Sequence, residues 1–149
     1  MFKTDPDRRL SHWSEFRKIL DQHDDPFNAI ASFWRDAPLI PHNHIIDPYY
    51  PASWPTPWEI VYDNKYDDFT LALMIGWTIL LTEKFKNSKV ELKTLVDDQA
   101  SRLYNIVCVD DQWALNFIDG EAVALDKVPS LYRLENLVPV SYTHLTLPT

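Results

Sequence analysis

The segment His42-Asn43-His44, with Asp47 close behind, offers the side chains most suited to binding a metal ion. Two imidazoles and a carboxylate can hold zinc or iron. However, the segment is short and proline-rich, and no further ligand lies close in the sequence. We therefore expect capping and packing roles and no cofactor. A metal-dependent hydrolase that uses His42, His44 and Asp47 is kept as the alternative function.

The single cysteine, Cys108, is the second candidate for chemistry. It lies among Ile106, Val107 and Val109, a run typical of a strand. A strand interior lacks the helix-terminus field that lowers a thiol pKa, so we expect an inert, packed side chain. A thiol enzyme using Cys108 is a third and weaker hypothesis. One cysteine also excludes an internal disulfide and favours a reducing compartment.

Adjacent aspartates could suggest general acid–base chemistry, and the chain has four such pairs. All of them fall at expected helix starts or turns, where aspartate has a structural role. We therefore do not interpret them as catalytic. The pairs are Asp24-Asp25, Asp67-Asp68, Asp97-Asp98 and Asp110-Asp111.

The composition excludes several classes of function. The formal charge of −8 disfavours nucleic acid and anionic membrane surfaces as partners. Only Gly76 and Gly120 are glycines, so a phosphate-binding glycine loop is excluded. The first six residues do not resemble a signal peptide, and the apolar run 69–81 is shorter than the ~18 residues of a membrane span. We expect an intracellular or virion-associated protein.

The elements that must position these residues are helices followed by strands. We predict helices over residues 7–23 and from Pro26 to before Pro38, with Asp25 as N-cap of the second. Residues 66–85 form the strongest helix, apolar on all sides and therefore buried. Strands are predicted at 90–96, 102–109 and 112–118, and a fourth at 121–128. The fold class is α+β, with N-terminal helices and one buried central helix packed on an antiparallel sheet of three to four strands.

Residues 37–57 contain six prolines, a density that excludes a helix or a central strand. We expect this segment to cross the core with its aromatic side chains buried. An extended proline-rich ligand for a partner is the alternative. The aromatic residues concerned are Tyr49, Tyr50, Trp54 and Trp58.

Four short pieces make this layout more specific. They are residues 54–59 (Trp54-Pro55-Thr56-Pro57-Trp58-Glu59), 64–70 (Asn64-Lys65-Tyr66-Asp67-Asp68-Phe69-Thr70), 103–107 (Leu103-Tyr104-Asn105-Ile106-Val107) and 113–116 (Trp113-Ala114-Leu115-Asn116). In order, they resemble segments around the active site of the bacterial transglutaminase-like cysteine proteinases, within the papain and transglutaminase superfamily. The resemblance covers residues 54–117. It implies a nucleophilic cysteine at the start of the buried helix, a histidine on one strand and an orienting residue on the next.

Carried over position by position, the resemblance places Tyr66 where the nucleophile belongs. Tyr104, or Asn105 one residue along, takes the place of the histidine, and Asn116 that of the orienting residue. A phenol of pKa ~10 without a base is a poor nucleophile, so we expect thiol-acyl chemistry to be lost. We expect these three side chains to converge. The first hypothesis is a non-catalytic binding or structural protein with a protein or peptide partner and no catalytic residue.

Residues 140–149 resemble the translation of a transposase adapter used in sequencing libraries. We therefore expect a single domain over residues 1–139, a non-native tail and a missing native C-terminus, and we exclude His144 as a catalytic candidate. An environmental origin and the aromatic composition resemble those of uncharacterised marine tailed-phage proteins. That resemblance implies a virion or host-interaction role.

Overall fold

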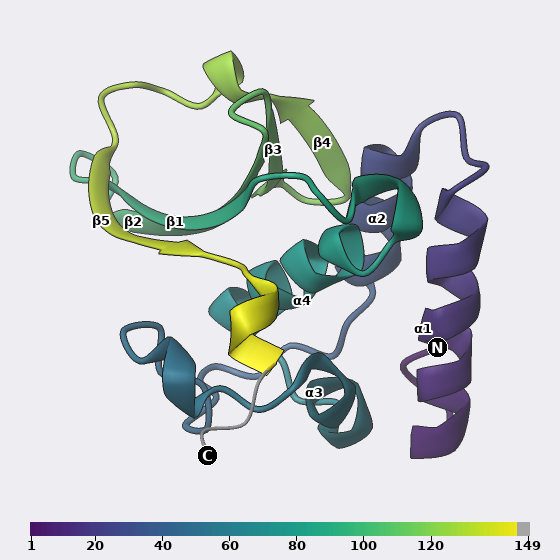
Figure 1. Cartoon of the computed structure of the whole chain (residues 1–149). Helices are drawn as coiled ribbons and strands as arrows, with labels where there is room; N and C mark the ends of the chain where they lie inside the picture. The colour runs from purple at the N-terminus through teal and green to yellow at the C-terminus, as the bar shows by residue number, and fades with distance from the viewer. Residues whose placement is uncertain (146–149) are drawn as a thin grey trace.

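A computed structural model describes residues 1–145, apart from the side chain of His144. The chain order is helices first and strands second, and Figure 1 shows the helices gathered on one side of a curved sheet. The predicted α+β class is confirmed. None of the helices formed by residues 1–145 combines the length and the apolar content that crossing a membrane requires.

Two N-terminal helices form where the sequence predicts them. Helix α1 (Pro6–Leu20) is capped by Asp5, whose side chain accepts a hydrogen bond from the backbone N–H of Arg8. Helix α2 (Pro26–Arg35) begins at Pro26 as predicted, with Asp25 at the N-cap. The side chains expected to face inward are buried or packed against the core, and they are Leu10, Trp13, Phe16, Leu20, Ile30, Phe33 and Trp34.

A third helix, α3 (Pro57–Asp63), was not predicted. The last proline of the proline-rich segment occupies its first position, where the absent N–H is not needed. Thr56 and Glu59 complete a capping box, in which each side chain bonds the other residue's backbone N–H. The signal for a helix start was therefore present at the point where the prolines end.

The expected burial of the aromatic residues in this segment is correct only for Trp54, which is 7% exposed. Its indole N–H donates to the carbonyl of Asp47 at 2.7 Å. Tyr49 and Tyr50 are 67% and 61% exposed, and Trp58 is 38% exposed, so the prediction is wrong for these residues. A 3₁₀ turn at Pro51–Ser53 directly follows the two tyrosines.

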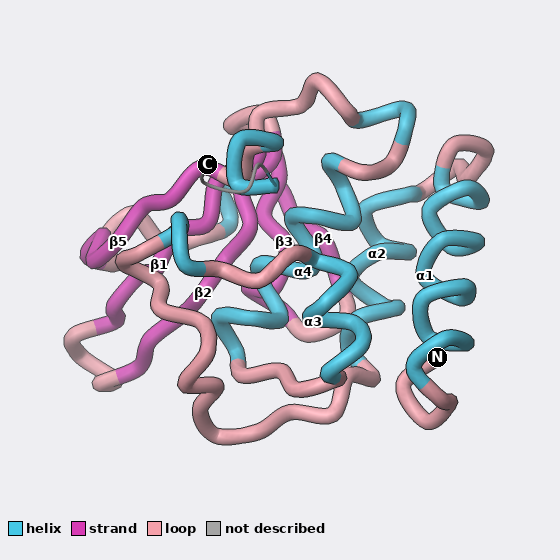
Figure 2. Tube along the Cα trace, turned by 60° about the horizontal axis from the view of Figure 1, so that its bottom comes forward, coloured by secondary structure: helices cyan, strands magenta, loops and turns pink. Residues whose placement is uncertain are grey.

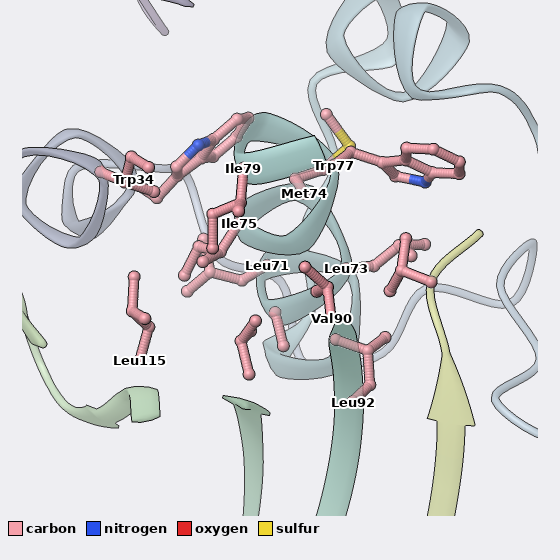
Figure 3. Close-up of a cluster of buried hydrophobic side chains, with 14 of the residues drawn as sticks. Trp34, Leu71, Leu73, Met74, Ile75, Trp77, Ile79, Val90, Leu92 and Leu115 are labelled. Atoms are coloured by element: carbon pink, nitrogen blue, oxygen red, sulfur yellow. The ribbon is translucent and has the colours of Figure 1, made fainter. Parts of the chain in front are cut away.

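Helix α4 (Asp68–Leu80) is the buried central helix, shorter than the predicted 66–85. Every residue from its second position onward is buried, and Figure 3 shows its side chains projecting around the whole circumference. Thr78 gives this apolar helix its main polar anchor. Its hydroxyl accepts hydrogen bonds from the indoles of Trp13 (3.0 Å) and Trp34 (2.9 Å). This hydroxyl therefore ties α1 and α2 to α4.

Within the described residues the sheet has five antiparallel strands in the order β4-β3-β2-β1-β5, where three to four were predicted. The strands are β1 (Val90–Asp97), β2 (Arg102–Val109), β3 (Trp113–Ile118), β4 (Glu121–Ala124) and β5 (Arg133–Pro139). Strand β5 returns to pair with β1 at the far edge, and its irregular apolar pattern gave no strand signal. Figure 2 shows the strands together on one side and the helices on the other.

The two faces of the sheet carry different clusters, as the period of two requires. The face towards α4 contributes Val90, Leu92, Val107, Val109 and Leu115 to the main core. The other face forms a smaller cluster around Ile106, Cys108 and Ala114, covered in part by Tyr104, Phe117 and Tyr132. Cys108 is 1% exposed, so its predicted packed position is confirmed.

Candidate functional site

Three polar side chains meet where the N-terminus of α4 faces strands β2 and β3. The Asp68 carboxylate, at the first position of α4, accepts a hydrogen bond from the Asn105 amide of β2 at 2.9 Å. The side-chain amide of Asn116, on β3, donates to the other carboxylate oxygen of Asp68 at 3.3 Å. It also donates to the backbone carbonyl of Asn105 at 2.8 Å. We call these three residues the polar cluster.

The backbone fixes the amides of the cluster in place. Asn105 is 8% exposed, and its side-chain oxygen accepts a hydrogen bond from the Thr94 hydroxyl of β1 at 2.8 Å. Asn116 has φ +65°, in the left-handed region that asparagine tolerates better than most residues. The pairing of β3 with β4 shifts register just there, between Leu115 and Ile118. This bulge accompanies the turn of the Asn116 side chain towards α4.

The preceding acid, Asp67, has the capping role expected of it. One of its carboxylate oxygens accepts hydrogen bonds from the backbone N–H of Thr70 (2.8 Å) and the Thr70 hydroxyl (2.6 Å). The other accepts from the backbone N–H of Asn43 at 3.1 Å, which ties the proline-rich segment to α4. Of the acid pair Asp67-Asp68, only Asp68 belongs to the polar cluster.

A cleft of about 280 Å³ opens beside the polar cluster. The guanidinium of Arg102 lies 4.6 Å from the centre of the Tyr104 ring in its wall. The cleft therefore combines two carboxylates, two amides, one cation and aromatic surface. Its lining residues are Asp68, Arg102, Leu103, Tyr104, Asn105, Asn116, Phe117 and Asp119.

Tyr66 lies in the core and not in the polar cluster. It is 0% exposed, and its ring contacts those of Phe2 and Trp34 at centroid distances of 5.8 and 5.5 Å. Burial raises the pKa of the Tyr66 phenol well above its ordinary value, with a small opposing effect from the charge of Arg9. Ionisation of this phenol is therefore strongly disfavoured, which argues against a nucleophilic role.

Tyr104 lies on the face of the sheet that is turned away from α4. Its ring stacks on Tyr132 at 5.4 Å and packs against Phe117 at 5.2 Å. The expected convergence of Tyr66, Tyr104 and Asn116 is therefore not found. The structure brings Asn116 together with Asn105, the one-residue alternative, and with Asp68.

Sequence reasoning missed the place of Asp68 in the polar cluster because it started the buried helix at Tyr66, two residues before the observed first position. The pattern Asp67-x-x-Thr70 is a helix-capping signal that places the helix start at Asp68. Alternation along β2 likewise puts Asn105 on the face of Val107 and Val109, towards α4.

The structure does not bring His42, His44 and Asp47, the ligands of the alternative metal hypothesis, together as a set. The His42 and His44 rings lie edge to face with centroids 4.4 Å apart, and the nearest carboxylate contact of His42 is with Asp67 at 3.9 Å. Asp47 instead accepts a hydrogen bond from the backbone N–H of Tyr49 at 2.9 Å. Within residues 1–145, no group of three or more His, Cys, Asp or Glu side chains could hold a metal ion.

The chain has an α+β fold in which the polar cluster lies where the buried helix meets the strands, and it shares this fold with solved structures. The solved structures that it resembles are of LapG from Legionella pneumophila. The calcium-bound form gives a TM-score of 0.68 at 12% identity over 91% of this chain and 77% of that one. The EGTA-treated form gives 0.65 at 13% identity over 95% and 81%. No protein-family model and no curated protein matches the chain.

The tail predicted to be foreign is only partly described. Val140 is 5% exposed and its N–H donates to the carbonyl of Val90 at 2.9 Å. Residues 141–145 are also described, apart from the side chain of His144, with a 3₁₀ helix at Tyr142–Leu145, and residues 146–149 lie outside the described residues.

Proposed function

We propose that this chain is a non-catalytic binding domain built on a cysteine-protease-like scaffold. The observation that carries the proposal is the hydrogen-bonded cluster of Asp68, Asn105 and Asn116. These groups include neither a thiol nor an imidazole, and acyl transfer needs a nucleophile paired with a base. The Asp68 carboxylate is already held by two amide donors, so the cluster is better suited to ordering the cleft than to attacking a substrate.

The ligand of the proposed domain is a protein or peptide segment held in the 280 Å³ cleft. Amide, carboxylate and guanidinium groups in its lining supply hydrogen bonds for a peptide backbone, and aromatic surface supplies contact area. Calcium is bound in one of the LapG structures. Residues 1–145 of this chain contain no cluster of acidic or histidine ligands that fits such an ion, so the proposal includes no metal.

Selection of peptides from a random library against the purified protein tests this function. We expect a selected peptide to shift the side-chain amide NMR signals of Asn105 and Asn116 and to stay intact during long incubation. Cleavage of the peptide by the purified protein would overturn the non-catalytic proposal. Binding that leaves both amide signals unmoved would place the ligand elsewhere.

A second experiment tests whether the cluster holds the degenerate catalytic positions. Asp68→Cys combined with Asn105→His puts a thiol at a helix N-terminus beside an imidazole, an arrangement that lowers a thiol pKa. We expect Cys alkylation at pH 7 to be at least tenfold faster in the double variant than in Asp68→Cys alone. Equal rates would mean that these positions do not face each other as proposed.

The role of the domain in a virion or in host interaction is also part of the proposal. It rests on two resemblances given in the sequence analysis. Residues 140–149 resemble an adapter translation, which implies an environmental origin, and that origin and the aromatic composition resemble those of marine tailed-phage proteins. Mass spectrometry of purified particles from a source sample that carries this gene tests it. Peptides of this chain are expected in the particle fraction, and their restriction to infected-cell lysate would contradict a virion role.

A further inference from the structure

A second surface groove lies between α1 and α3, which Figure 1 shows side by side. It has a volume of about 400 Å³ and is lined by Leu10, Trp58, Glu59, Tyr62 and Asp63. None of these residues lines the cleft beside the polar cluster. We call it the α3 groove.

Two aromatic side chains form one wall of the α3 groove. Trp58 and Tyr62 are four residues apart on α3 and therefore lie on the same face of the helix. They are 38% and 53% exposed, respectively. The Trp58 ring makes an edge contact with the buried ring of Trp13, at a centroid distance of 6.4 Å. The groove thus presents a held indole and a phenol ring to the outside.

Two carboxylates stand beside the rings with no cation paired to them. Glu59 and Asp63 are also four residues apart, and no ion pair joins either to a cation within residues 1–145. Arg9, the cation that contacts α3, is buried and donates instead to the carbonyls of Thr4, Val61 and Tyr62. Its charge is therefore engaged by the backbone. Glu59 accepts a hydrogen bond from the Thr56 backbone N–H, but neither its charge nor that of Asp63 is paired with a cation within residues 1–145.

These features all favour the same kind of ligand. Aromatic faces attract a guanidinium or ammonium group, and carboxylates beside them pair with its charge. Leu10 supplies apolar surface for the aliphatic stem of an arginine or lysine. The formal charge of −8 adds long-range attraction for a cation. We propose that the α3 groove binds an arginine- or lysine-bearing segment of a partner protein.

Chemical-shift mapping of the full chain tests the proposal with a defined probe. The probe is the acetylated and amidated peptide Ala-Leu-Arg-Leu-Ala, and the control has glutamate in place of arginine. The arginine peptide is expected to shift the Trp58 indole N–H signal saturably, and the glutamate peptide to leave it unmoved. Equal shifts from both peptides, or no shift from either, would overturn the proposal.

A charge-removing variant separates this site from a general attraction of cations to an acidic protein. Glu59→Gln with Asp63→Asn removes both charges, and glutamine preserves the capping box at Thr56. We expect the arginine peptide to bind at least fivefold more weakly to this variant. The matched control, Glu15→Gln with Asp24→Asn, removes two exposed charges elsewhere and is expected to bind as the wild type does. Equal loss in both variants would show non-specific attraction only.

Because the two sites share no lining residue, the outcomes are independent. Failure of the α3 groove to bind the peptide leaves the proposed binding function of the cleft unchanged, and the reverse also holds.

Discussion

The side-chain amide of Asn105 donates to the carboxylate of Asp68 at 2.9 Å, across the junction of a buried helix and a sheet. At this junction an acceptor at the first position of α4 and a donor on β2 hold each other. The pair therefore stabilises the junction, and its removal should be measurable as a loss of stability.

Asp68→Ala should lower the free energy of unfolding by about 1–3 kcal/mol, because it leaves the largely buried amide of Asn105 without its acceptor. Urea unfolding followed by circular dichroism measures the change. Asp126→Ala, at an exposed aspartate, is the control and should stay within about 0.5 kcal/mol of the wild type. A loss at Asp68 no larger than the loss at Asp126 would show that the polar cluster contributes nothing to stability.

Thr78→Val should be far more destabilising than Thr78→Ser. Valine keeps the shape of threonine but leaves the buried indole N–H groups of Trp13 and Trp34 without an acceptor. At ~1–3 kcal/mol for each unsatisfied donor, a loss of roughly 2–6 kcal/mol is expected. Serine retains the hydroxyl and should lose less than half as much. Thermal or urea unfolding compares the two, and similar losses would mean that packing and not hydrogen bonding dominates.

Tyr66→Phe should leave stability unchanged or raise it by up to about 1 kcal/mol. The hydroxyl of Tyr66 is buried and has no hydrogen-bond partner within residues 1–145, so its removal takes away an unmatched polar group. Equilibrium unfolding at neutral pH measures the effect. A loss above about 1 kcal/mol would show that the hydroxyl is hydrogen-bonded, for example to an internal water. Phe2→Leu, in the same aromatic group, is a packing control that should be destabilising.

Cys108 should react slowly with iodoacetamide in the folded protein. Burial raises the pKa of its thiol from 9.0 to about 11, so at pH 8 the thiolate fraction falls by roughly 100-fold relative to the unfolded chain. The folded pKa is raised, so the stabilisation from the neutral thiol is present below pH 9 and is lost as the pH rises towards 11. Labelling rates at pH 8 with and without 8 M urea measure the protection. Fast labelling of the folded protein would revive the thiol-enzyme hypothesis.

The sequence by itself determined the elements whose signals are local. The apolar circumference of residues 69–80 predicted a buried helix, because no other placement removes all of those side chains from water. Pro26 started α2 as predicted, and the bounds of β2, Arg102–Val109, are those of the predicted strand. The α+β class followed from the order of these signals along the chain.

Only the tertiary structure decided which residues meet. Tyr66 fits the motif but enters the core beside Phe2 and Trp34, because the helix begins at Asp68. Asn116 reaches the polar cluster through a left-handed residue in a bulge, which a regular period of two does not predict. Local patterns fix the state of a segment, but the register between a helix start and two strands is a property of the packed whole. A shift of one or two residues in the helix start decides whether the core residue Tyr66 or the carboxylate of Asp68 lies in the polar cluster.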